Sequence, residues 1–180
     1  EIGDPEVRNR GRLGGSLAHA DPAADYPATM LAVDAEIHIK GPKGWRKVKA
    51  SDFFQGLFTV DLQPDEIIAG VQFAPVKAAA YAKLHQRASH FAIVGVAAAV
   101  EVKGGVFQWG RIGLTGASTH ATRMTAVEQA LAGKPATKET FSTASAAASP
   151  DDFNSDIHAS DEYRRAMVKV FTRRALLLDL

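Results

Sequence analysis

Three strand-like segments follow one another in the middle of the chain, and they constrain the fold more than any other feature of the sequence. They lie at residues 79–86, 93–103 and 106–115, and Gly104-Gly105 forms a tight turn between the last two. The run of alanines at residues 97–99 favours a helix by itself, but the flanking valines and the glycine turn favour a strand. The short connections predict that the three strands pair as an antiparallel sheet.

Helical signals replace strand signals toward the C-terminus. A first helix is predicted at residues 125–132, because Gly133 and Pro135 form a stop signal, and a second at residues 138–148. Ser160 is expected to cap a third helix. Apolar residues recur near helical spacing in this third helix and are expected in the core: Tyr163, Met167, Val170, Phe171 and Leu178. Its basic residues are expected mostly on a solvated face or against an acidic partner: Arg164, Arg165, Lys169 and Arg173.

The N-terminal part of the chain predicts a helix followed by a separate group of strands. Asp25 and Pro27 mark a helix start. Alternating residues at 37–48, interrupted by a Gly-Pro-Lys-Gly turn, predict a hairpin, and Ser51 is expected to cap a short helix that carries two phenylalanines. The β-branched residues at 67–73 predict another strand. Strands and helices are thus grouped rather than alternating, which favours an α+β fold over a doubly wound parallel sheet.

The charge balance and the absence of cysteine exclude several classes of function. Lysine and arginine number 21 against 20 acidic residues, so the chain lacks the basic surface that nucleic acids require. No window approaches the roughly 18 apolar residues of a membrane span and no secretory signal is evident, so we expect a soluble, cytoplasmic protein. Without cysteine the chain forms no disulfide, no thiolate zinc site and no iron–sulfur cluster of its own. The histidines lack metal-ligand spacing, and we expect no metal site.

A glycine pair, Gly14-Gly15, is the first candidate for a binding site. Adjacent glycines let the backbone approach a ligand closely, and the helix start that follows adds partial positive charge, so a pyrophosphate is a natural ligand. The pair alone is weak support, because most glycine pairs are turns. The two commonest nucleotide signatures, GxGxxG after a strand and GxxxxGK[ST], are absent.

The string around the glycine pair, RNRGRLGGSLAHADPAADYP, is more specific. It resembles the second flavin-binding segment of the FAD-binding medium subunits of molybdenum hydroxylases, the family of aerobic carbon monoxide dehydrogenase and xanthine dehydrogenase. Four further segments resemble successive parts of the same subunits, so the resemblance covers nearly the whole chain: FFQGLFTVDLQPDEIIAGVQF, AYAKLHQRASHFAIVGVAAAV, GLTGASTHATR and SDIHASDEYRRAMVKVFTRRAL.

The resemblance implies a fold, a cofactor and partners. Residues 1–76 would form the second part of a FAD-binding domain of the vanillyl-alcohol-oxidase/PCMH type. Residues 77–180 would form a domain like the C-terminal domain of carbon monoxide dehydrogenase flavoprotein, with a three-stranded antiparallel sheet and three helices. FAD would be the cofactor of a heterotrimeric oxidoreductase, in which a small subunit carries [2Fe-2S] clusters and a large subunit carries a molybdopterin cofactor. The chain would pass electrons from these clusters to an external acceptor. Carbon monoxide, an aldehyde or an N-heterocycle would be oxidised on the large subunit.

The resemblance also implies cofactor-binding residues and no catalytic ones. The FAD pyrophosphate would be held at Gly14, Gly15 and Ser16. Asp25 would contact the cofactor, although a helix cap is the commoner role for an aspartate at such a position and both roles are compatible. The remaining candidates are a backbone contact at Ile68, a side chain near the flavin at His85, where relatives often carry lysine, and an aromatic beside the flavin ring at Phe91. Arg12 replaces the family's usual threonine, and its guanidinium either pairs with phosphate or points outward.

The family's first glycine-rich segment has no counterpart before Glu1. We therefore expect that the N-terminal half of the FAD site is a missing segment or a separate chain, and that this chain alone binds FAD weakly. A different class of function stays open, namely a flavin-free scaffold that serves only subunit assembly.

Overall fold

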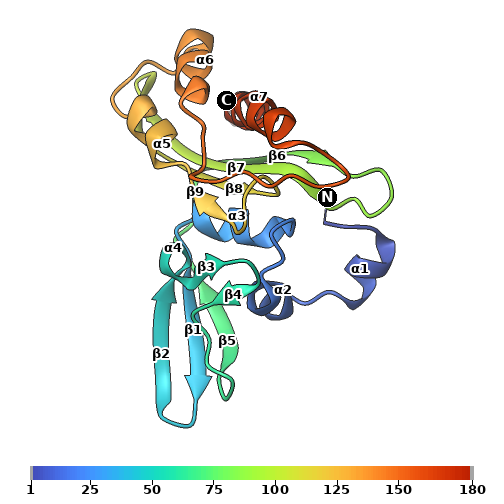
Figure 1. Ribbon diagram of the computed structural model, residues 1–180. Coiled ribbons are helices and arrows are strands. Elements are labelled where there is room, and N and C mark those ends of the chain that lie inside the picture. Colours follow the sequence, from blue (N-terminus) through green and yellow to red (C-terminus); the bar gives the residue numbers. More distant parts are fainter. Residues whose placement is uncertain (1, 179–180) are drawn as a thin grey trace.

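The computed structural model of the protein describes residues 2–178. Figure 1 shows an antiparallel sheet covered by helices, a smaller part built around a β-hairpin, and helix α3 between the two. The helices are α1 (Pro5–Arg10), α2 (Leu13–His19), α3 (Asp25–Ala32), α4 (Ala50–Phe53), α5 (Thr125–Leu131), α6 (Lys138–Ala146) and α7 (Asp161–Leu178). The strands are β1 (Glu36–Gly41), β2 (Gly44–Lys49), β3 (Phe54–Gly56), β4 (Thr59–Val60), β5 (Ile67–Gln72), β6 (Ala78–His85), β7 (Ala92–Lys103), β8 (Val106–Thr115) and β9 (Thr122–Arg123).

The main sheet has the strand order β6-β7-β8-β9, and all its neighbours are antiparallel. Gly104 and Gly105 have φ angles of 58° and 74°, the left-handed conformation that a two-residue hairpin turn requires. The three long strands and their antiparallel pairing confirm the α+β prediction, and the alanine run lies inside β7 as expected. The short strand β9 adds a fourth member to the predicted three-stranded sheet, because Thr122 and Arg123 pair with β8.

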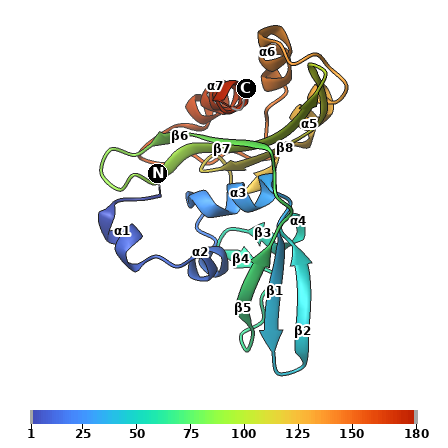
Figure 2. The same ribbon diagram turned by 180° about the vertical axis from the view of Figure 1, so that it is seen from behind.

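Both faces of the main sheet are covered. Valines 94, 96 and 100 and Ala98 on β7 pack with α5, α6 and α7 in the larger core. The alternate residues Ala97 and Ala99 pack against Ala28 and Ala32 of α3 on the opposite face. Figures 1 and 2 show α3 on the side of the main sheet away from α7. Only small side chains allow this close approach. At Gly113 of β8 an added Cβ would overlap the carbonyl oxygen of Ala28.

The hairpin sheet has the order β2-β1-β5, which confirms the hairpin and the strand predicted for this part. Ile37 and Ile39 point into a second core, which also contains Leu17 of α2 and Phe53 of α4. Ser51 lies inside α4 and its hydroxyl contacts Asp52, so the predicted cap is wrong, and Lys49 occupies the N-cap position. The main chain of α4 therefore follows directly from β2.

Helix α7 begins as predicted, since the Ser160 hydroxyl accepts a hydrogen bond from the amide of Tyr163. The prediction of which residues of α7 are buried is only partly right. Tyr163 is 46% exposed and Leu178 is 68% exposed, whereas Arg164, expected mostly on the solvated face, is 2% exposed. Helical spacing locates a face, but the sheet and the loop before α7 decide which part of that face is covered.

Candidate functional site

Five of the eight predicted cofactor-binding residues line one cavity of about 420 Å³, called the main cavity below. These five are Arg12, Gly15, Ser16, Asp25 and Phe91. The other residues that line it come from the N-terminal segment, α1, α2 and the loop before α3: Ile2, Gly3, Val7, Arg10, Gly11, His19, Asp21 and Ala24. The main cavity thus lies where the first 25 residues face the turn before β7.

The glycine pair lies in the first turn of helix α2, not in a loop as the sequence suggested. The amide of Ser16 donates to the Arg12 carbonyl at 3.0 Å, so the amides of the residues between them have no acceptor within the helix. The two glycines differ in their surroundings. An added Cβ on Gly14 would contact Ile68 of β5 at 3.8 Å, whereas one on Gly15 would have no atom within 4 Å. Gly15 therefore leaves open space beside the cavity that a larger residue would fill.

Two arginines line the same cavity near these amides. The Arg12 guanidinium bends back and donates to the carbonyl oxygens of Gly11 at 2.9 Å and Arg10 at 3.3 Å. Arg12 is exposed, so these contacts leave its other nitrogens accessible to an anion. Free amides and guanidinium groups are the donors that a diphosphate requires.

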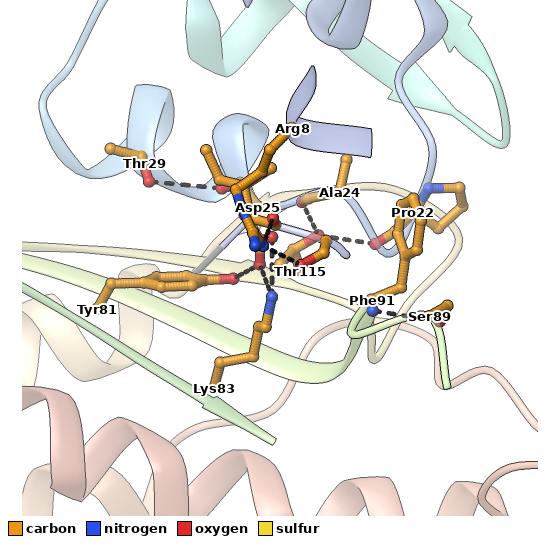
Figure 3. A network of polar contacts seen from close by, with 12 residues as sticks. Arg8, Pro22, Ala24, Asp25, Thr29, Tyr81, Lys83, Ser89, Phe91 and Thr115 are labelled. Carbon is orange, nitrogen blue, oxygen red and sulfur yellow. Dashed lines mark hydrogen bonds and ion pairs between the residues drawn. The ribbon is translucent and has the colours of Figure 1, made fainter. Parts of the chain in front are cut away.

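Asp25 is buried, with 6% of its surface exposed, and it is not a helix cap. It is the first residue of α3, whose N-cap position is Ala24. Figure 3 shows its carboxylate facing two side chains of β6. The Tyr81 hydroxyl donates to Oδ1, and the Lys83 ammonium contacts Oδ1 at 3.0 Å and Oδ2 at 2.9 Å. The cap alternative is therefore wrong, because the side chain points toward the main sheet.

Sequence reasoning missed Tyr81 and Lys83. The available signal was their spacing, since residues two apart on a strand share a face. A lysine and a tyrosine stand on one face of a strand that otherwise consists largely of alanine. Such a lysine needs a buried partner of opposite charge.

The main sheet also holds the loop that precedes Asp25. The Thr115 hydroxyl lies within donating distance of two carbonyl oxygens of this loop, at 2.7 Å from Pro22 and 2.8 Å from Ala24 (Figure 3). The amide of Gly116 donates to the same Pro22 oxygen at 2.7 Å. The Asp21 carboxylate accepts a hydrogen bond from the amide of Ala23 at 2.8 Å, which stabilises the turn before α3. This side of the cavity is therefore fixed to β8.

The other three predicted residues lie apart from the main cavity. Gly14 of α2 faces Ile68 of β5, since a Cβ added at Gly14 would lie 3.8 Å from Ile68. His85 lines a second cavity of about 310 Å³ together with Gly3, Arg8, Lys83 and His90, and its ring lies 5.0 Å from the ring of His90. Gly3 lines both cavities, so the two are neighbours.

The lining of the main cavity fits FAD. Free amides and two arginines suit a diphosphate, and the half-buried ring of Phe91 offers an apolar surface to an aromatic ring system. Within residues 2–178, no cluster of histidine and acidic side chains could hold a metal ion, and no helix is long and apolar enough to cross a membrane.

Two family models match the chain. The model described as the FAD binding domain in molybdopterin dehydrogenase matches residues 1–76. The model described as the CO dehydrogenase flavoprotein C-terminal domain matches residues 79–178, more than half of the chain.

Similar proteins include the glyceraldehyde dehydrogenase medium chain of Sulfolobus acidocaldarius, which is 34% identical over 177 residues, covering 97% of this chain and 63% of that protein. The carbon monoxide dehydrogenase medium chain of Hydrogenophaga pseudoflava is 35% identical over 179 residues, covering 97% of this chain and 62% of that protein. This chain thus spans less than two thirds of the length of these relatives.

Solved structures show the same fold. Carbon monoxide dehydrogenase from Hydrogenophaga pseudoflava superposes with a TM-score of 0.91 at 36% identity, covering 99% of this chain and 63% of that one. Quinoline 2-oxidoreductase from Pseudomonas putida 86 superposes with a TM-score of 0.90 at 33% identity, with the same coverage. From its motifs, its fold and these matches, the chain belongs to the family of FAD-binding medium subunits of the molybdenum hydroxylases.

Proposed function

We propose that this chain binds FAD in the main cavity and serves as the electron-transfer subunit of a multi-subunit oxidoreductase. One observation carries the proposal. Five of the eight residues that the family motif assigns to the cofactor gather around a single cavity, although they are up to 79 positions apart in the chain, from Arg12 to Phe91. That cavity lies largely within the segment matched by the FAD-binding model.

The residues of the cavity have distinct roles in this proposal. The amide of Gly15 and the hydroxyl of Ser16 hold the diphosphate, and Arg12 neutralises part of its charge. Phe91 would offer an apolar surface to the ring system of the bound cofactor and exclude water from it. FAD, when bound, supplies the electron-carrying chemistry of its ring, and the protein supplies binding, orientation and charge.

Asp25, Ile68 and His85 complete the proposed set. Asp25 lines the cavity with a carboxylate fixed by Lys83. Gly14 and Ile68 support the cavity from outside it, because Gly14 of α2 faces Ile68 of β5, and His85 lines the neighbouring second cavity. No nucleophile or general base is required of this chain, because electron transfer needs neither.

The partners follow from the relatives. Because the similar proteins are medium chains of dehydrogenases and hydroxylases, we infer that this chain assembles with a small subunit bearing [2Fe-2S] clusters and a large subunit bearing a molybdopterin cofactor. The chain receives electrons from the clusters and delivers them to an external acceptor, in the cytoplasm. Glyceraldehyde, carbon monoxide and nicotine in the names of relatives indicate that the substrate differs among the complexes. The family resemblance, rather than any residue of this chain, assigns the substrate site to the large subunit.

The test is purification of the native complex through this chain. We expect flavin absorbance to co-purify with this chain. We also expect two further subunits in the same complex, one carrying iron and the other molybdenum. A complex that assembles without flavin would refute the electron-transfer role and leave the flavin-free scaffold as the function.

A further inference from the structure

Asp25 and Lys83 form a buried ion pair between the main cavity and the second cavity. We propose that Lys83 is a positioning residue for the cofactor site, acting through Asp25. This inference rests on the proposed function, since it concerns how the protein prepares the main cavity for an anionic dinucleotide.

The pair is placed between the two cavities. Asp25 lines the main cavity and Lys83 lines the second cavity. Their side chains are 7% and 2% exposed, and Nζ of Lys83 lies 2.9 Å from Oδ2 of Asp25. With the Tyr81 hydroxyl, Asp25 accepts three hydrogen bonds, so most of its acceptor capacity is used by β6. The carboxylate consequently has one orientation at the cavity wall.

The neighbouring strand is shaped to permit this arrangement. Gly95 of β7 pairs with Lys83 on one side and with Thr115 on the other. A Cβ at Gly95 would overlap the Tyr81 hydroxyl and lie 2.8 Å from the Cγ2 atom of Thr115. A side chain at this position would thus exclude Tyr81 from Asp25 and disturb the hydroxyl that holds the loop before it. Only glycine leaves space for both contacts.

The ion pair changes the net charge of the cavity wall that faces a bound diphosphate. A buried carboxylate without a partner is costly and takes up a proton more readily. It would also repel a diphosphate bound in the same cavity. Lys83 cancels this charge, so that the cationic groups of the cavity act on the ligand without opposition from Asp25.

Other charged and titratable groups face the pair. Arg10, Arg12, His19 and Asp21 line the main cavity with Asp25. Arg8, His85 and His90 line the second cavity with Lys83, and Tyr81 contacts Asp25 directly. All of these groups are present in both the wild type and a Lys83 variant, so a difference between their FAD affinities reports on the ion pair.

The experiment is a FAD titration, followed by quenching of flavin fluorescence, from about pH 6 to about pH 9. The variants are Lys83→Met, Asp25→Asn, their double mutant and Lys103→Met, in the full chain within its complex. Lys103→Met is the matched control, because Lys103 is 66% exposed and pairs with Glu101 on the surface of the same sheet. Thermal unfolding without added FAD is recorded in parallel.

For Lys83→Met we expect FAD binding about tenfold weaker, because the Asp25 carboxylate then faces the diphosphate without a compensating charge. The double mutant should bind more tightly than Lys83→Met, because the repelling carboxylate is gone. Lys103→Met should match the wild type throughout. Lys83→Gln replaces Lys83→Met if the latter does not fold, and the same loss and the same rescue by Asp25→Asn are expected of it.

Wild-type affinity in Lys83→Met would overturn the inference while leaving the proposed function intact. A double mutant no better than Lys83→Met would also overturn it, since the loss would then not pass through Asp25. A wild type that binds no FAD at any pH would instead refute the proposed function, and this inference with it.

Discussion

Replacing Arg164 by methionine should remove a large part of the stability of this protein. The Arg164 guanidinium is buried and donates three hydrogen bonds of 2.6 Å, to the carbonyl oxygens of Ile93 and Gly116 and to the carboxylate of Asp156. It thereby joins α7 to the start of β7 and to the turn after β8.

The loss of stability depends on which of the three acceptors can form a hydrogen bond with water once the guanidinium is removed. The two carbonyl oxygens lie in the interior, and each buried acceptor left without a donor costs about 1–3 kcal/mol. Asp156 has a side chain that is 43% exposed, so water replaces the lost bond there at little cost. We expect a loss of about 4 kcal/mol, within the range for breaking a buried charged network. For a chain of this length that corresponds to a fall in the unfolding midpoint on the order of 10 °C.

The assay is thermal and urea unfolding of Arg164→Met beside Arg165→Met. Arg165 is the matched control, because it is the next residue on α7 and its exposed guanidinium stacks on Phe153 at 4.2 Å from the ring centroid. The control should lose about 1 kcal/mol or less. Equal losses in the two variants would refute the argument, since it attributes the effect to burial and hydrogen bonding at Arg164 alone.

Three further predictions concern the cofactor site, the hairpin sheet and the larger core. Gly15→Val should abolish FAD binding and leave the unfolding midpoint nearly unchanged, whereas Gly70→Val, at another glycine with open space around it, should bind FAD normally; equal affinities would contradict the placement of the diphosphate. Hydrogen bonding by Arg46 lowers the pKa of Glu66 to about 2, so the stability from this pair is present above the ordinary pKa near 4.3 and is lost as the pH falls toward 2. Unfolding of Arg46→Gln between about pH 5 and about pH 2 should therefore depend less steeply on pH than unfolding of the wild type, and parallel curves would contradict this. Phe107→Ala should cost about 3–5 kcal/mol in urea unfolding because Phe107 is 1% exposed in the larger core, and a loss below about 1 kcal/mol would show that the core is not packed as described.

The secondary structure of the main sheet was predictable because its signals are local. The left-handed turn at Gly104-Gly105 and the stop at Gly133, with a φ angle of 70°, depend on a few neighbouring residues. The helix at α2 was missed for the same reason. Two glycines in seven residues oppose a helix locally, and the packing of Leu17 into the second core compensates for that cost.

The candidate site was predictable in its residues but not in their contacts. The string around the glycine pair identifies the family, and with it Gly15, Ser16, Asp25 and Phe91, which line one cavity. The placement of His85 in a neighbouring cavity was not predictable, because that cavity is formed with Gly3 and Arg8 from the distant N-terminal segment. The domain boundary at residue 76 and the individual roles of the predicted residues stay predictions.

The sequence by itself determined the α+β class, the hairpins and the family, because turn residues, strand alternation and a contiguous motif act over short distances along the chain. Tertiary structure alone decided that Asp25 meets Lys83, 58 positions away, and that Arg164 meets Ile93, 71 positions away. A charged side chain has no local preference for burial. It is buried only where the folded chain brings together the partners that replace its water, and those partners lie on strands and loops far from it in the sequence.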